Sequence, residues 1–173
     1  MKRWDILDRI IKSNGFKRCA ELGVKEGRLT SFLLANNPDL HMVAVDLFAP
    51  IDRPASPGVE RYDDWDFDAI KKEFMDRIDQ HKDRVRFLQM TTTDAAVHVE
   101  DDALDLVFID AGHDYDSVYE DITNWLPKVR YGGIVSGHDY NQRFVGVQRA
   151  VAELFPLQDV HLESDSVWWL VKK

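Results

Sequence analysis

The chain has 173 residues, of which 45% are hydrophobic and 31% are charged, and its formal net charge is −9. This length suits a single domain over residues 1–173, which can bury roughly 70% of its unfolded surface without a disulfide or a structural metal. The acidic balance and the lack of any Lys/Arg cluster argue against nucleic acid and anionic membranes as partners. No signal peptide and no apolar run of about 20 residues is present. We therefore expect a cytoplasmic protein.

Helix and strand patterns alternate along the chain. Helices are predicted over residues 1–15, 28–36, 67–78, 95–99, 118–129 and 147–155, with Gly132-Gly133 breaking the fifth. Strands are predicted over residues 16–22, 41–47, 85–90, 104–109, from 134 onward, 159–163 and 167–171. The pattern predicts an α/β fold with a Rossmann-like, doubly wound sheet that is mostly parallel and ends in an antiparallel C-terminal hairpin.

A long loop over residues 49–66 separates the second predicted strand from the next helix and contains three prolines. Loops of this length are uncommon in compact domains unless they are functional or mobile. We predict a lid over a ligand, to which Phe48, Tyr62 and Trp65 contribute. Packing of the loop on its own helix is the alternative.

The first predicted strand runs into a turn, Glu21-Leu-Gly-Val-Lys-Glu-Gly27, at the sheet edge where open α/β folds bind ligands. A dinucleotide-binding turn carries three glycines, whereas Lys25 stands here in place of the middle one. The carboxylate of Glu21 would repel a pyrophosphate but suits a cationic cofactor. Asp46 ends the second strand and can accept hydrogen bonds from both ribose hydroxyls. These charges favour S-adenosylmethionine over NAD; a surface role for Glu21 and a turn-capping role for Asp46 are the alternatives.

Four segments resemble class I S-adenosylmethionine-dependent methyltransferases. They are the Glu-x-Gly-x-x-x-Gly turn, Asp46, the segment Asp105-Leu-Val-Phe-Ile-Asp-Ala-Gly-His-Asp-Tyr115, and Gly132-Gly133 with His138-Asp139-Tyr140. The resemblance extends from about residue 16 to residue 171. It points to the branch of small-molecule O-methyltransferases that act on sugars of macrolides and similar metabolites, related to cephalosporin-hydroxylase-like proteins. It implies the class I methyltransferase fold and a small hydroxylated acceptor, such as a sugar or a glycosylated metabolite.

The same resemblance implies roles for residues at the strand ends. The acid and backbone of the first turn would hold the methionine part of the cofactor, Asp46 the ribose, and residues after the third strand the adenine. The expected cofactor-binding residues are Glu21, Gly23, Val24, Gly27, Asp46, Leu47, Thr92, Thr93 and Asp110.

Polar residues also follow the fourth and fifth predicted strands. Since adjacent strands lie about 4.8 Å apart, Asp110 should approach His138 and Asp139 beside the cofactor. These three side chains are the predicted ligands of a divalent metal. Carboxylates suit Mg²⁺ or Mn²⁺, whereas a histidine shifts the preference toward Mn²⁺, Fe²⁺ or Zn²⁺. Metal-dependent relatives carry acidic or amide residues at these places, so His138 is a departure.

Methyl transfer to an alcohol needs an activated oxygen. A metal bound to the acceptor hydroxyl would lower its pKa, and a base would then remove the proton. His113, three residues after Asp110, is the predicted base, with an unperturbed pKa of about 6.5. Each of these residues has a structural alternative: Asp110 as a turn cap, His113 as a loop residue bonded to a neighbouring aspartate, and the His138-Asp139 pair as part of an ordinary loop.

Three other functions remain open at this point. A dinucleotide-dependent oxidoreductase would need a turn that accepts pyrophosphate, and a non-catalytic nucleoside-cofactor-binding module would keep the fold without the chemistry. A metal-dependent hydrolase would leave the first turn unexplained. The acceptor and the oligomeric state, including a homo-oligomer, are also open.

Overall fold

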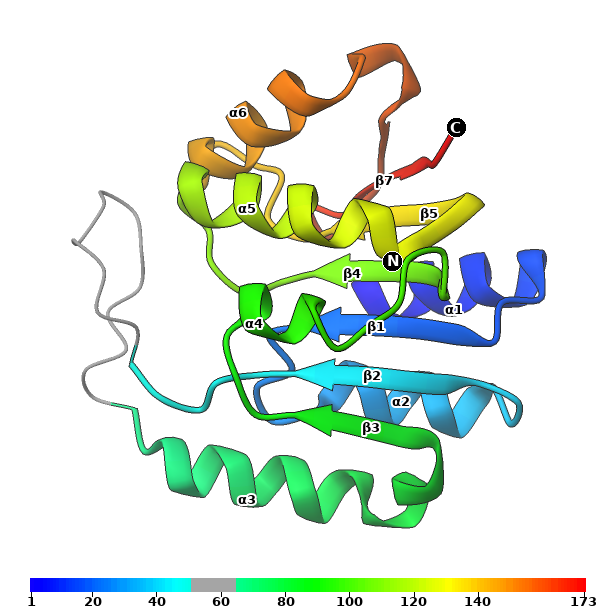
Figure 1. Cartoon of the computed structure of the whole chain (residues 1–173), viewed down its shortest axis with the longest axis vertical. Helices are drawn as coiled ribbons and strands as arrows, with labels where there is room; N and C mark the ends of the chain where they lie inside the picture. The colour runs from blue at the N-terminus through cyan, green and yellow to red at the C-terminus, as the bar shows by residue number, and fades with distance from the viewer. Residues whose placement is uncertain (51–64) are drawn as a thin grey trace.

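A computed structural model describes residues 1–50 and 65–173 of the chain (Figure 1). Most of the predicted lid, Tyr62 included, lies outside these residues. Among the described helices, none is both long enough and apolar enough to cross a membrane.

The described residues form one sheet with the strand order β3-β2-β1-β4-β5-β7-β6. Strands β1 to β5 are parallel, and β7 is antiparallel to both β5 and β6. The chain leaves β1 outward to β3 and then returns to β4, so the order reverses between β1 and β4, where such sheets bind ligands. The predicted Rossmann-like fold with an antiparallel C-terminal hairpin is confirmed. The strands are β1 (Arg18–Leu22), β2 (His41–Val45), β3 (Val85–Leu88), β4 (Leu104–Ile109), β5 (Val129–Gly137), β6 (His161–Leu162) and β7 (Trp168–Val171).

Helices cover both faces of the sheet (Figure 1). Helices α1 (Arg3–Asn14), α2 (Arg28–Asn36) and α3 (Phe67–Ile78) pack on one face. Helices α4 (Thr92–Ala96), α5 (Tyr115–Trp125) and α6 (Val145–Leu154) pack on the other. Every residue of β4 is buried, as expected for a central parallel strand covered on both faces. Short 3-10 helices lie at Asp79–Arg84, Leu126–Lys128 and Leu157–Asp159.

Helix α1 confirms the predicted N-terminal helix and is docked firmly on the sheet. Its apolar stripe, with Ile6 and Leu7 both 0% exposed, packs against β1, β4 and α2. It ends at Gly15, which takes the left-handed conformation that closes many helices. This docking brings the first residue of the helix, Arg3, to the end of the sheet where β4 and β5 finish.

The predicted helix over residues 118–129 is too long. Helix α5 ends at Trp125, because Pro127 follows and has no N–H for a further helical hydrogen bond. Val129 already belongs to β5, and Gly132-Gly133 lie inside that strand, where they do not break a helix. The pairing of β4 with β5 shifts register here, and a Cβ on Gly133 would lie 2.6 Å from the carbonyl oxygen of Asp105. The glycines therefore permit an irregular strand to pass close to β4.

The short helix predicted over residues 95–99 begins three residues earlier. Thr91 is its N-cap, and its hydroxyl accepts a hydrogen bond from the amide of Asp94 at 3.0 Å. Thr92 and Thr93 therefore stand in the first turn of α4, whereas they were expected in a loop.

Candidate active site

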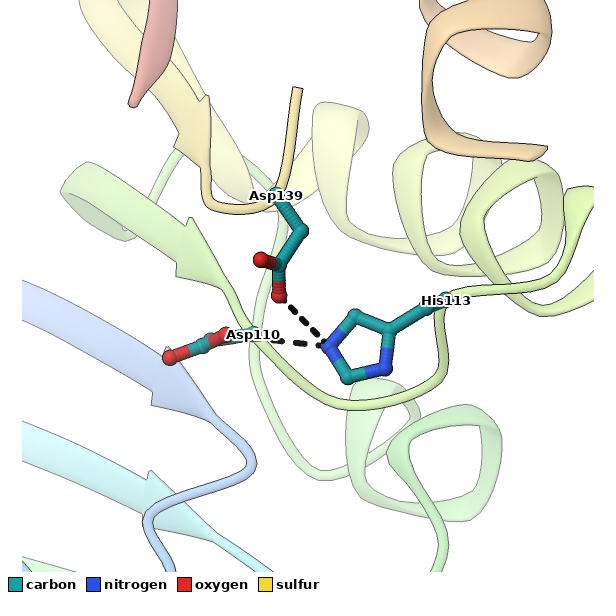
Figure 2. Close-up of side chains that lie close together, drawn as sticks. All are labelled: Asp110, His113 and Asp139. Atoms are coloured by element: carbon teal, nitrogen blue, oxygen red, sulfur yellow. Dashed lines mark ion pairs between the residues drawn. The ribbon is translucent and has the colours of Figure 1, made fainter. Parts of the chain in front are cut away.

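Four side chains that follow β4 and β5 come together in one cluster. Figure 2 shows three of them, Asp110, His113 and Asp139. The Nε2 atom of His113 lies 2.8 Å from Oδ2 of Asp139 and 4.0 Å from Oδ1 of Asp110. The Nδ1 atom of His138 lies 3.2 Å from Oδ2 of Asp139 and 3.5 Å from Oδ1 of Asp110. The structure thus brings together all four residues that the sequence singled out at these strand ends.

The parallel register of β4 and β5 explains this convergence. Ile109 pairs with Gly137, so the residues that follow, Asp110 and His138, leave the sheet side by side. The amide of His138 donates to the carbonyl of Ile109 at 3.0 Å and extends the pairing beyond the strands. Asp139 then adopts a φ of 61°, a left-handed conformation that Asp tolerates better than most residues.

The loop that carries His113 is held from two directions. Asp114 is the N-cap of α5, with its carboxylate accepting from the amide of Ser117 at 3.0 Å. On the other side, the His113 ring packs on Phe144 with 4.5 Å between ring centroids. A Cβ on Gly146 of α6 would lie 2.7 Å from the carbonyl oxygen of His113, so α6 approaches this loop closely. His113 therefore has a defined position facing Asp139.

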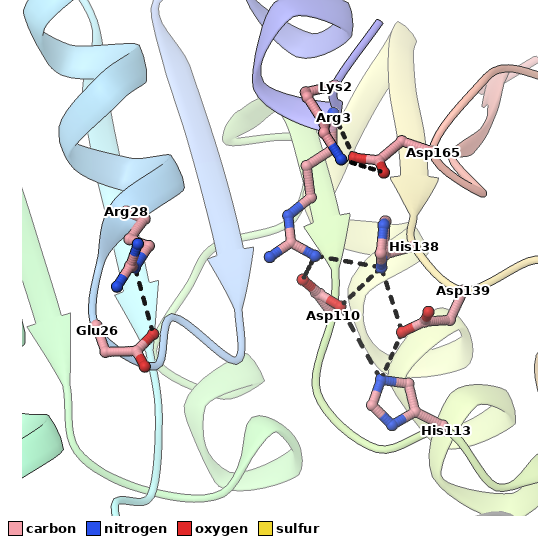
Figure 3. A network of polar contacts seen from close by, with 9 residues as sticks. All are labelled: Lys2, Arg3, Glu26, Arg28, Asp110, His113, His138, Asp139 and Asp165. Atoms are coloured by element: carbon pink, nitrogen blue, oxygen red, sulfur yellow. Dashed lines mark hydrogen bonds and ion pairs between the residues drawn. The ribbon is translucent and has the colours of Figure 1, made fainter.

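A fifth side chain, Arg3, joins the cluster (Figure 3). Its Nη1 atom lies 3.0 Å from Oδ2 of Asp110 and 3.2 Å from Nδ1 of His138. The sequence contains no signal for this contact, because Arg3 belongs to no motif and stands 135 positions from His138. Only the packing of α1 on the sheet brings it there.

The cluster is arranged as alternating charges. Burial alone would lower the pKa of His138, but its hydrogen bonds to Asp110 and Asp139 outweigh burial and raise that pKa to about 9. Burial alone would raise the pKa of Asp139, but hydrogen bonds from His113 and His138 hold it well below its usual range. Both carboxylates of the cluster are therefore linked to groups that donate hydrogen bonds, on Arg3 and on the two histidines.

Some side chains of the cluster carry atoms that could bind a metal ion. Among the described residues, Asp110, His113 and Asp139 offer one ligand atom each, all within 4.8 Å of one another. This set differs from the predicted one, because His113 takes the place of His138. A divalent ion does not fit the arrangement as it stands, since the guanidinium of Arg3 already pairs with Asp110.

Glu21 is buried and does not lie on the surface, which excludes the surface role considered for it. It is 3% exposed, and the hydroxyl of Thr30 in α2 donates to its Oε2 atom. Burial is the largest influence on its pKa and raises it to about 8, although the bond from Thr30 acts in the opposite direction. A buried carboxyl beside the cofactor turn is therefore mostly neutral at pH 7 and becomes anionic when a cation approaches.

Burial of Glu21 should make stability depend on pH. The folded state keeps a proton on Glu21 that the unfolded state releases above about pH 4.5, so the free energy of unfolding falls as pH rises toward about 8. In Glu21→Gln this contribution is absent, and we expect the variant to gain about 2–4 kcal/mol relative to the wild type between about pH 5 and about pH 9. Urea denaturation of both proteins across this range measures the difference. If the difference in the free energy of unfolding between the two proteins does not change with pH, Glu21 is ionised in the folded protein.

Asp46 joins the end of β2 to the first turn. Its Oδ2 atom accepts from the amide of Lys25 and its Oδ1 atom from the amide of Phe48, both at 2.9 Å. Burial raises the pKa of Asp46, and these amide hydrogen bonds partly oppose the rise. Asp46 therefore caps the turn, as the turn-capping alternative predicted. A carboxylate has about four lone-pair positions, so two remain for ribose hydroxyls.

The two glycines of the first turn allow other parts of the protein to pack closely against it. Gly23 has a φ of 85°, and a Cβ on it would lie 2.3 Å from the carbonyl oxygen of Asp110. Gly27 has a φ of 73°, and a Cβ on it would lie 2.6 Å from the ring of Phe74. The first contact matters for the site, because it places the turn directly against the backbone that carries Asp110.

The remaining predicted cofactor residues are placed as follows. Val24 is 3% exposed and packs with Phe48 and Phe74, so its side chain belongs to the core. The carbonyl of Leu47 accepts from the side chain of Gln89 at 3.4 Å. The carbonyl of Thr92 accepts from the indole of Trp125 at 3.0 Å, and Thr93 is exposed. Their roles toward a cofactor stay predictions.

Solved structures share this fold over nearly the whole chain. The O-methyltransferase NovP matches with a TM-score of 0.73 and 20% identity, over 99% of this chain and 79% of its own. TomG of Streptomyces achromogenes, an O-methyltransferase in complex with S-adenosylmethionine, has a TM-score of 0.70 and 16% identity, over 99% of this chain and 80% of its own. The methyltransferase PaMTH1 of Podospora anserina has a TM-score of 0.71 and 15% identity, over 99% and 78% respectively. At these identities the likeness concerns the fold.

Sequence comparison adds a family. A segment of 58 residues, 34% of the chain, is 38% identical to an uncharacterized protein, y4gI, of Sinorhizobium fredii, and it spans 6% of that protein. The model of a methyltransferase domain family matches residues 20–140, from β1 through the His138-Asp139 pair. Since this match covers more than half of the chain, the chain belongs to this methyltransferase domain family.

Proposed function

We propose that the protein transfers the methyl group of S-adenosylmethionine to a hydroxyl oxygen of a small molecule. One observation carries this proposal: Gly23 of the first turn lies against the backbone of Asp110, so the predicted cofactor turn and the polar cluster are neighbours. Glu21 and Asp46 on the turn side suit a cofactor with a positive charge and a ribose. The cluster of Asp110, His113 and Asp139 supplies groups that can act on a hydroxyl.

The chemistry would be a single in-line displacement. The acceptor oxygen attacks the methyl carbon, the bond from carbon to sulfur breaks, and S-adenosylhomocysteine leaves with the electron pair. The acceptor proton passes to Nδ1 of His113, because Nε2 already donates a hydrogen bond to Asp139 and Nδ1 has no hydrogen-bond partner among the described residues. Asp139, 2.8 Å from Nε2, stabilises the imidazolium that forms.

The metal predicted from the sequence, with Asp110, His138 and Asp139 as ligands, would lower the pKa of an acceptor hydroxyl. It is not part of this proposal, because the arrangement of the cluster does not fit a divalent ion. No step of the proposal depends on it, because Arg3 already pairs with Asp110.

The acceptor class rests on the family resemblance and on the structural neighbours. NovP and TomG are both named O-methyltransferases, and TomG is involved in tomaymycin synthesis. A small hydroxylated acceptor, such as a sugar or a glycosylated metabolite, is therefore the first class to test. A cytoplasmic location and assembly into a homo-oligomer also stay predictions.

The test is to measure S-adenosylhomocysteine formed when the protein, S-adenosylmethionine and a panel of sugars, glycosides and phenols are combined. Release that depends on an acceptor, with a matching mass increase of one methyl group on it, supports the proposal. Cofactor binding without transfer to any member would favour the non-catalytic module. Binding of NAD(H) in place of S-adenosylmethionine would favour the oxidoreductase.

The role of Asp46 gives a sharper expectation. Asp46→Ala removes a carboxylate that would accept hydrogen bonds from the ribose, and S-adenosylmethionine should bind roughly 10–100 times more weakly, as measured by calorimetry. Asp39→Ala is the matched control, because Asp39 follows α2 at an exposed position with its side chain 82% exposed. Its affinity should equal that of the wild type. Equal affinities in all three proteins would remove Asp46 from the cofactor site.

A further inference from the structure

The guanidinium of Arg3 lies where the sequence predicts a metal ion. Nη1 is 3.0 Å from Oδ2 of Asp110 and 3.2 Å from Nδ1 of His138, so it reaches residues at the ends of both β4 and β5 (Figure 3). The Asp110 side chain is only 12% exposed. A guanidinium carries its charge at every pH at which proteins fold, so Asp110 faces a permanent positive charge.

Arg3 is held in place by the fold. Its backbone amide donates to Oδ2 of Asp165 at 2.9 Å, which ties the start of α1 to the turn between β6 and β7. Lys2 adds an ion pair to the same carboxylate, with 3.6 Å between Nζ and Oδ1. Further along α1, Arg9 pairs with Glu163 at 2.6 Å. The cation therefore extends from the first residue of a docked helix.

A metal ion and Arg3 would compete for the same carboxylate. Asp110 belongs to the only group of three side chains in the described residues whose donor atoms lie close enough to hold an ion. A divalent ion bound there would lie within a few ångströms of the guanidinium, in a partly buried place where like charges repel strongly. The guanidinium of Arg3 already pairs with Asp110 at 3.0 Å without the ion.

We propose that Arg3 is the resident cation of this site and that it excludes divalent metal ions from Asp110 and Asp139. Its side chain is 32% exposed, and its guanidinium has five N–H donors, so some can reach a bound molecule. The positive charge beside an acceptor oxygen is then supplied by the guanidinium of Arg3, which donates hydrogen bonds, and not by a metal ion. This inference goes beyond the proposed methyl transfer and holds whether or not the chain transfers a methyl group.

The test is a titration with Mn²⁺ alone, without cofactor or acceptor, followed by electron paramagnetic resonance of the free ion. Wild-type protein should bind Mn²⁺ weakly. Arg3→Met, which keeps bulk and removes charge, should bind one Mn²⁺ at least about tenfold more tightly. Arg3→Lys should resemble the wild type, because it retains the charge. Adding Asp110→Asn to Arg3→Met should abolish the gain.

Arg9→Ala is the control for helix docking, because Arg9 anchors the same helix away from the cluster. It should bind Mn²⁺ as weakly as the wild type. Thermal unfolding of each variant checks folding, and Arg3→Gln is a second neutral variant for the case that Arg3→Met does not fold. Equal Mn²⁺ affinity in the wild type and the neutral variants, strong or weak, would overturn the proposal. An equal gain in Arg9→Ala would assign the effect to helix docking and overturn it as well.

Discussion

Gly23→Ala is expected to lose about 2–4 kcal/mol of folding free energy. The added Cβ would lie 2.3 Å from the carbonyl oxygen of Asp110 and 2.8 Å from the Cα of Ala111. Both are backbone atoms of the segment that leaves β4, so they cannot move aside as the end of a flexible side chain can. The positive φ of 85° adds strain for any residue with a Cβ.

Gly15→Ala is the matched control for this prediction. Gly15 also has a positive φ, 64°, but a Cβ on it would meet nothing within 4 Å. It should lose only about 1 kcal/mol, the strain of the left-handed conformation. Urea denaturation of the two variants separates steric contact from backbone strain. Similar losses in both would mean that the turn does not press against the end of β4, and the closeness of the predicted cofactor turn to the polar cluster would be in question.

His113→Asn is expected to lower the rate of methyl transfer by about 10²–10⁴-fold, the usual contribution of a general base. The affinity for S-adenosylmethionine should change little, because His113 contacts Asp139 and Phe144, neither of which is a predicted cofactor residue. The measurement is kcat together with cofactor affinity, using whichever acceptor the panel identifies.

His98→Asn is the control, since His98 is exposed just after α4, outside the cluster. It should retain wild-type kcat. A rate in His113→Asn within about threefold of the wild type would show that another group accepts the proton. Loss of cofactor affinity together with rate would point instead to a structural role.

The strand ends could be predicted from sequence because the evidence for them is local. Buried parallel strands appear as short apolar runs, and the first polar residue after each run marks the ligand-binding edge of the sheet. Asp46, Asp110 and the His138-Asp139 pair were identified in this way. The parallel register then makes their proximity nearly unavoidable.

Other features depend on contacts that leave no local pattern. Arg3 reaches the cluster only because α1 docks on the sheet, so nothing near it in sequence marks it. Thr30 contacts Glu21 from α2, and Glu21 is buried because β1 is a central strand of a sheet with helices on both faces. The helix predicted to reach Val129 was too long because apolar residues at helical spacing continue into the next strand, where periodicity alone cannot separate the two.

The most direct test of the account is calorimetric titration of the wild-type protein with S-adenosylmethionine and, separately, with NAD and NADH. We expect one saturable site for S-adenosylmethionine and none for either dinucleotide, because the first turn has Lys25 in place of the middle glycine of a dinucleotide-binding turn. Saturable binding of a dinucleotide without binding of S-adenosylmethionine would contradict it.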